Sequence, residues 1–178
     1  MADIIVNDKK FSIYIKHDDI IASIAALAEK MNKDLQGKNP LFVVVLNGAF
    51  VFASELITRY KGDCEVSFVR LSSYEGTGSK NIVNELLGLN IDVKDRTVVI
   101  VEDIVDTGLT MLVATEKLRA AGAKDVFIAT LLFKPKAFKH NYKIHYVGIE
   151  IPNDFIVGFG LDYDEKARNL PDIYKISE

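Results

Sequence analysis

Continuous apolar runs at regular intervals constrain the fold of this chain more than any other feature. Residues 41–46 read Leu-Phe-Val-Val-Val-Leu, with no alternation of polar and apolar side chains, and residues 97–101 are similar. Such runs are typical of strands that are buried on both faces, as in a parallel sheet. Helical patterns of about 10–15 residues separate them, which predicts βαβ units with right-handed crossovers. We therefore expect an α/β protein whose central sheet is mostly parallel.

The patterns place the remaining elements along the chain. A first helix is expected to start with Asp18 or Asp19 as its cap and to end at Gly37. Residues 72–81 are polar and contain glycines, which predicts a mobile loop. Further helices are predicted at residues 49–60 and 109–121, and strands at residues 3–6, 10–15, 41–46, 65–71, 97–101, 126–133 and 144–149.

Composition excludes several classes of protein. The net charge is −3, from 22 basic and 25 acidic residues, which argues against nucleic-acid binding through bulk charge. Cys64 is the only cysteine, so no intrachain disulfide can form. The N-terminal residues lack a signal-peptide pattern, and the longest apolar run is shorter than the roughly 20 residues that span a bilayer. We expect a cytoplasmic protein with no membrane or nucleic-acid partner.

The segment that carries the chemistry lies at the end of the strand at residues 97–101. Ligands of open α/β sheets bind outside the carboxyl ends of the strands, and a helix N-terminus offers free N–H groups to an anion. Gly108 allows close approach of the backbone, and two threonines add hydroxyl donors. We predict that this turn holds a monophosphate. The contact residues are Asp106, Thr107, Gly108, Leu109 and Thr110.

Glu102 and Asp103 need a separate explanation, because two adjacent carboxylates would repel a phosphate. They make sense if they accept hydrogen bonds from sugar hydroxyls or hold Mg²⁺. The combination therefore indicates a phosphorylated sugar. The alternative is an acidic loop in which Asp106 only caps the next helix. Neither a P-loop nor a Gly-x-Gly-x-x-Gly motif after a strand is present.

Residues 101–110 closely resemble the phosphoribosyl-diphosphate signature of type I phosphoribosyltransferases, in the form of the hypoxanthine-guanine branch. The similarity runs from about Leu41 to the end of the chain. It includes Leu46-Asn47-Gly48 at the diphosphate-binding loop, Ser72-Ser73-Tyr74 at the mobile catalytic loop, and Phe133-Lys134-Pro135 with residues 151–163 at the base-binding hood. The resemblance implies the type I phosphoribosyltransferase fold in a single domain of residues 1–178. Its core would be about residues 35–135, and a small hood would comprise the N-terminal strands and about residues 134–178.

The resemblance also implies the reaction. The 5-phosphoribosyl group would pass from 5-phosphoribosyl 1-diphosphate to N9 of hypoxanthine or guanine, giving IMP or GMP and diphosphate, as in purine salvage. Mg²⁺ is the implied cofactor, and a homodimer or homotetramer is the implied assembly. Two alternatives stay open: an enzyme that prefers xanthine, and a regulatory protein that senses phosphoribosyl diphosphate.

The resemblance also implies roles for residues near the base and the diphosphate, and the chemistry of each side chain suits its role. Lys134 would donate to the 6-oxo group, which an amino base cannot accept. Phe155 would stack on the base, and Ile156 would offer backbone groups to its edge. Asp162, in the purine-binding stretch, would coordinate Mg²⁺, and Arg168 would neutralise the departing diphosphate. The alternatives are a solvated lysine, a core phenylalanine and a surface arginine.

The remaining implied roles concern the sugar and the lid. Glu102 and Asp103 would hold the ribose hydroxyls and contribute to metal binding, and Asp106 would exchange a proton near N7 of the base. Ser73 and Tyr74 would belong to a lid that excludes water.

One position departs from the family pattern. Many relatives carry a lysine or arginine where this chain has Asn47, at a point where the family uses a cis peptide bond after Leu46. The diphosphate loop, Leu46-Asn47-Gly48, therefore lacks one positive charge.

Overall fold

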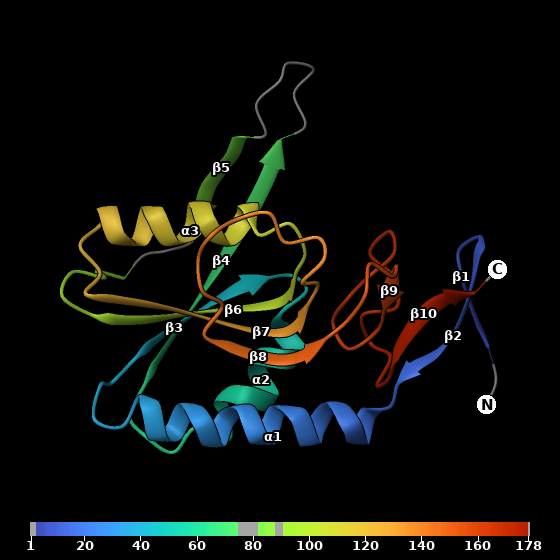
Figure 1. The fold of residues 1–178 in the computed structure, drawn as a ribbon, viewed down its shortest axis with the longest axis horizontal. Helices are drawn as coiled ribbons and strands as arrows, with labels where there is room; N and C mark the ends of the chain where they lie inside the picture. Colours follow the sequence, from blue (N-terminus) through green and yellow to red (C-terminus); the bar gives the residue numbers. More distant parts are fainter. Residues whose placement is uncertain (1–2, 75–81, 88–90, 178) are drawn as a thin grey trace.

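The computed structural model describes residues 3–74, 82–87 and 91–177, which form two sheets (Figure 1). Six strands make the central sheet: β3 (Leu41–Leu46), β4 (Glu65–Tyr74), β5 (Ile82–Leu87), β6 (Thr97–Val105), β7 (Asp125–Phe133) and β8 (Tyr146–Glu150). Their order is β5-β4-β3-β6-β7-β8. All neighbours pair in parallel except β4 and β5, which are antiparallel. The predicted mostly parallel α/β sheet is thus confirmed.

Helices cover both faces of this sheet. Helices α1 (His17–Asp34) and α2 (Phe50–Ile57) lie on one face, and α3 (Leu109–Ala120) lies on the other (Figure 1). Side chains of β3 alternate between the two cores: Phe42 and Val44 belong to the core under α1 and α2, and Val43 belongs to the core under α3. Burial on both faces explains why the sequence of β3 is apolar without alternation.

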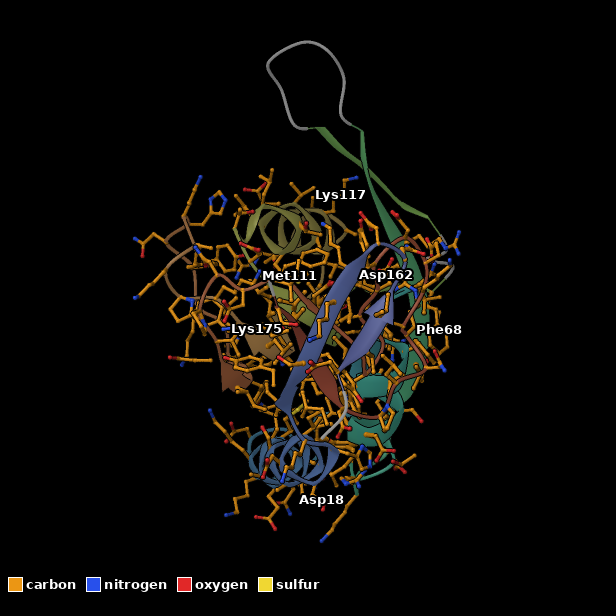
Figure 2. The ribbon with its side chains drawn as sticks, turned by 90° about the vertical axis from the view of Figure 1, so that its right-hand side faces the viewer. Asp18, Phe68, Met111, Lys117, Asp162 and Lys175 are labelled. Atoms are coloured by element: carbon orange, nitrogen blue, oxygen red, sulfur yellow. The ribbon has the colours of Figure 1, made fainter. Side chains whose placement is uncertain are left out.

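The small sheet lies beside the carboxyl ends of the central strands (Figure 1). It is antiparallel, in the order β1-β2-β10-β9, and contains β1 (Ile4–Val6), β2 (Lys9–Ile15), β9 (Ile156–Val157) and β10 (Ile173–Ser177). The N-terminal strands thus pair with the last strand of the chain. Figure 2 looks onto this sheet, with Asp162 labelled beside it.

Two local predictions are wrong. Helix α1 has Lys16 at its N-cap, and Asp18 and Asp19 lie in its first turn. The backbone N–H of His17 is bound instead by the Asp172 carboxylate, at 2.8 Å, so a residue distant in sequence supplies the acceptor that was expected locally.

Part of the loop expected at residues 72–81 is instead a strand. Ser72, Ser73 and Tyr74 continue β4, because β5 folds back along them: Ser73 lies opposite Val83 and Tyr74 opposite Ile82. Residues 75–81 and the side chains of Ser73 and Tyr74 lie outside the described part of the structure. Among the described residues, no helix is both long and apolar enough to cross a membrane.

Candidate active site

Three parallel strands end at the same edge of the central sheet and bring distant segments together. Strand β3 ends at Leu46, β6 at Val105 and β7 at Phe133, and β3 and β7 both pair with β6. Because parallel strands share their direction, the residues that follow them meet at this edge. The edge faces the small sheet (Figure 1).

The phosphate turn, residues 106–110, connects β6 to α3. Gly108 has φ +88°, a left-handed conformation that disfavours other residues, and it is the N-cap of α3 with no side-chain cap. The first N–H groups of a helix have no acceptor inside the helix. Residues 102, 104–108, 110 and 111 line a small cavity of about 100 Å³ at this point. Free donors beside a cavity suit an anion such as phosphate.

The carboxylate pair, Glu102 and Asp103, is held in the wall of the site. Asp103 is 8% exposed, and the Oε2 atom of Glu102 is enclosed without a hydrogen-bond partner among the described residues. Burial raises the pKa of Glu102 well above its ordinary value, and the neighbouring Asp103 carboxyl raises it further. Burial also raises the pKa of Asp103, although its hydrogen bonds to Glu102 and to backbone N–H groups and the nearby Arg168 act in the opposite direction.

The Leu46-Asn47-Gly48 loop packs directly on this pair. A Cβ atom at Gly48 would lie 1.7 Å from Oδ2 of Asp103, so only glycine fits here without a shift of the carboxylate. The Leu46–Asn47 peptide is cis, as expected. Oδ1 of Asn47 accepts a hydrogen bond from the Arg70 guanidinium, at 2.9 Å. Arg70 was not predicted from the sequence. It lies on β4, opposite Leu46 of β3, and brings a positive charge to the diphosphate loop.

Lys134, directly after β7, forms an ion pair with Asp106 of the phosphate turn. Its Nζ atom lies 2.9 Å from Oδ2 of Asp106, and the lysine side chain is 12% exposed. A lysine side chain that is mostly buried and paired with Asp106 contradicts the alternative of a solvated lysine. Charged lysines are rarely buried unless they are paired, and the Asp106 carboxylate supplies that partner here.

Arg168 lies in the loop between β9 and β10. Its guanidinium donates to the carbonyl of Gly160 and contacts the carboxylate of Asp162, both at 2.9 Å. Gly160 in turn touches the diphosphate loop, since a Cβ atom there would lie 2.2 Å from the carbonyl oxygen of Gly48. Arg168 is thus anchored beside the loop and is not an isolated surface residue.

Asp162 does not join the other predicted metal ligands. Within the described ranges, no three His, Cys, Asp or Glu side chains gather around a possible metal position. In the described structure, Glu102, Asp103 and Asp162 therefore do not form one metal site from protein groups alone, and their roles as metal ligands stay predictions. Asp162 instead accepts from the Glu165 N–H at 2.9 Å and pairs with Arg168.

Phe155 and Ile156 differ in exposure. Ile156 is buried in β9 and pairs with Lys175 of β10. Phe155 is 43% exposed, so the alternative of a core phenylalanine is wrong. Its ring packs edge-on against Tyr163, with centroids 5.6 Å apart, and the Lys9 ammonium lies 5.3 Å from its centroid. An exposed, braced ring is suited to stacking on a flat ligand.

Known proteins share this arrangement. Residues 12–164 match the phosphoribosyl transferase domain family. The hypoxanthine-guanine phosphoribosyltransferase of Streptococcus thermophilus is 41% identical over 167 residues, 93% of each chain. A hypoxanthine phosphoribosyltransferase from Staphylococcus aureus has a similar structure, with a TM-score of 0.85 and 35% identity over 93% of this chain and 91% of that one. A mutant of the Trypanosoma cruzi hypoxanthine phosphoribosyltransferase, in a ternary substrates complex, is also similar. Its TM-score is 0.86, with 32% identity over 93% of this chain and 94% of that one. The match over most of the sequence, on a sheet whose strand ends carry the signature residues, shows that this chain belongs to the phosphoribosyltransferase family.

Proposed function

We propose that this chain is a purine-salvage enzyme that transfers the 5-phosphoribosyl group from 5-phosphoribosyl 1-diphosphate to N9 of hypoxanthine or guanine. IMP or GMP and diphosphate are the products. The Lys134–Asp106 ion pair carries the proposal, because it joins a donor for a 6-oxo group to the phosphate turn. The named relatives, hypoxanthine and hypoxanthine-guanine phosphoribosyltransferases, support the same substrates.

The phosphate turn would bind the 5′-phosphate through free N–H groups and the Thr107 and Thr110 hydroxyls. Glu102 and Asp103 would accept hydrogen bonds from the ribose hydroxyls. The position of Glu102 in the lining of the cavity at the phosphate turn supports this role. Together these groups would fix the sugar so that its anomeric carbon faces the base.

The base would lie between Lys134 and Phe155. The Lys134 ammonium, a donor only, would bind the 6-oxo oxygen and disfavour the amino group of adenine. Phe155 would stack on the ring and Ile156 would offer backbone groups to its edge. Asp106, half-exposed and already beside Lys134, would exchange the proton at N7 as N9 forms its bond to the sugar.

The departing diphosphate needs positive charge. Arg168, anchored by Gly160, would neutralise part of it, and the Leu46-Asn47-Gly48 loop would bind it through backbone N–H groups. A lid that includes Ser73 and Tyr74 would exclude water, which otherwise competes with the purine.

Mg²⁺ is the proposed cofactor. Carboxylate oxygens suit this cation, and both the carboxylate pair and Asp162 retain lone pairs beyond their present contacts. Since these groups do not form one protein-only site, the ligand's own oxygens would complete the coordination. When bound, Mg²⁺ supplies positive charge against the diphosphate. The chain is further proposed to act in the cytoplasm as a single domain that forms a homodimer or homotetramer, with the free Cys64 suited to a reducing compartment.

A panel of bases tests the proposal. The chain is incubated with 5-phosphoribosyl 1-diphosphate, Mg²⁺ and either hypoxanthine, guanine, xanthine or adenine, and nucleotide formation is followed by chromatography. Turnover of hypoxanthine or guanine without adenine is expected. A preference for xanthine would keep the chain a 6-oxopurine phosphoribosyltransferase but change its substrate. Binding of phosphoribosyl diphosphate without turnover of any base would favour a ligand sensor.

A further inference from the structure

A segment that no part of the proposed mechanism uses packs against the back of the phosphate turn. Residues 135–142 follow Lys134, and three of them, Phe138, Lys139 and Tyr142, contact the turn. The backbone N–H of Lys139 donates to the carbonyl of Thr107 at 3.2 Å, and the Tyr142 hydroxyl donates to the carbonyl of Gly108 in a short hydrogen bond. The Phe138 ring fills the space beside Gly108, where a Cβ atom would lie 2.4 Å from it.

These contacts hold two consecutive peptide units of the turn. A trans peptide is planar, and its C=O and N–H groups point in opposite directions. The Thr107 carbonyl belongs to the same peptide unit as the Gly108 N–H, and the Gly108 carbonyl to the same unit as the Leu109 N–H. Fixing both carbonyls toward residues 139 and 142 therefore turns both N–H groups away from this segment, to the side that would receive the phosphate.

The Gly108 carbonyl has two acceptor positions, and both are used. One accepts the N–H of Leu112 at 3.0 Å, the first hydrogen bond of α3, and the other accepts the Tyr142 hydroxyl. The tyrosine thereby locks the peptide unit from which the helix starts. Without it, only the helix bond would orient that unit.

The tyrosine itself is held rigidly. Its ring meets Phe138 edge-on, with centroids 5.0 Å apart, and Phe138 meets Phe133 of β7 in the same manner at 5.3 Å. Burial raises the pKa of Tyr142 to about 12, so the hydroxyl keeps its proton and stays a donor at every physiological pH. The segment is also held at its start, because the backbone N–H of the preceding residue, Lys134, binds the Val105 carbonyl at 3.0 Å.

We infer that Tyr142 is a positioning residue for the 5′-phosphate site: it orients the Gly108–Leu109 peptide so that the turn is preformed before phosphoribosyl diphosphate binds. This inference rests on the proposed function. A preformed site avoids the loss of conformational freedom that binding would otherwise cause, so the tyrosine acts on affinity for the phosphorylated ligand rather than on the base.

Tyr142→Phe tests this role, with Tyr60→Phe as a matched control. Both changes remove one half-buried tyrosine hydroxyl that donates to a backbone carbonyl, since Tyr60 donates to Leu35 at 3.1 Å, away from the site. Steady-state kinetics should give a KM for 5-phosphoribosyl 1-diphosphate that is raised roughly 3- to 10-fold in Tyr142→Phe, the effect of one hydrogen bond. The KM for hypoxanthine and kcat should stay within about twofold, and Tyr60→Phe should leave all three constants unchanged.

Calorimetry separates this role from a purely structural one. Tyr142→Phe should weaken binding of ribose 5-phosphate by the same factor while its melting temperature stays close to that of Tyr60→Phe. Equal constants in the two variants would overturn the inference, and so would a parallel loss of purine affinity or a Tyr142→Phe chain that does not fold. Failure of the unmodified chain to convert any base would reject the proposed function alone, because ribose 5-phosphate binding would still test Tyr142.

Discussion

Replacing Glu102 by glutamine is expected to raise stability and lower activity at the same time. One carboxylate oxygen of Glu102 is enclosed without a partner among the described residues. An unsatisfied buried polar atom destabilises a protein by about 1–3 kcal/mol, and more when it is charged. Glutamine has nearly the same shape but does not ionise, so it removes the cost of burying an ionisable carboxyl without opening a cavity.

The pH dependence of folding stability shows in which direction the Glu102→Gln change should act. Burial and the adjacent Asp103 carboxyl raise the pKa of Glu102 above its ordinary value of 4.5, so the folded state keeps a proton that the unfolded state loses. The stabilising effect of that proton is fully present below pH 4.5 and is lost as the pH rises through the folded-state pKa. Glutamine does not titrate. Its stability advantage should therefore be small near pH 4.5 and grow at higher pH, by up to about 1.4 kcal/mol for each pH unit.

Urea unfolding of both proteins at pH 4.5, 6.0, 7.0 and 8.0 measures the difference directly. At pH 8.0 the variant should be more stable by about 1–3 kcal/mol, which corresponds to about 2–4 °C in Tm for each kcal/mol in a chain of this size. Glu116→Gln, at an exposed carboxylate on α3, is the control and should show no growing advantage. Stability curves of wild type and Glu102→Gln that run parallel from pH 4.5 to 8.0 would refute the reasoning.

The same variant should lose activity. Where Glu102 is ionised, a ribose hydroxyl bound by it gains about 1.5–3 kcal/mol, so kcat/KM measured above the folded-state pKa should fall by roughly 10- to 150-fold. Gain of stability together with loss of activity would identify Glu102 as a residue kept for function at the expense of folding.

Three further predictions concern the neighbouring groups. Gly48→Ala should displace the Asp103 carboxylate, destabilise the chain by about 1–3 kcal/mol and lower kcat/KM more than about tenfold. Gly37→Ala is the control: Gly37 lies at a left-handed turn with open space around it, so its replacement should change stability without changing kinetics. Lys134→Gln should raise the KM for hypoxanthine roughly 10- to 100-fold in initial-rate assays, and an unchanged KM would remove Lys134 from base recognition. Chelation of divalent cations with EDTA should abolish nucleotide formation and added MgCl₂ should restore it, and full activity in EDTA would exclude the proposed cofactor role.

Much of the central sheet could be predicted because its sequence signals are local. The run at residues 41–46 has no alternation since both faces of β3 are covered, and β6 and β7 are apolar for the same reason. The turn from β6 into α3 was also predictable, because a strand, a glycine and a helix start follow one another directly.

Contacts between distant segments could not be predicted from these signals. The acceptor for the His17 N–H is Asp172, 155 residues away, and the Tyr142–Gly108 hydrogen bond joins residues 34 apart. Tyr142 stands in a polar, lysine-containing stretch, and nothing in its immediate neighbourhood indicates that it contacts the phosphate turn. Strand β4 extends past its apolar part because of pairing with β5, a tertiary effect that the polar sequence of residues 72–74 conceals.

A crystal structure of the chain with IMP and Mg²⁺ would test the central claim most directly. The account predicts electron density for the 5′-phosphate on the turn at residues 106–110, ribose hydroxyls within hydrogen-bonding distance of Glu102 and Asp103, and the 6-oxo oxygen about 3 Å from the Lys134 ammonium. IMP bound away from the end of β6, or with its base turned away from Lys134, would contradict the assignment of this strand end as the active site.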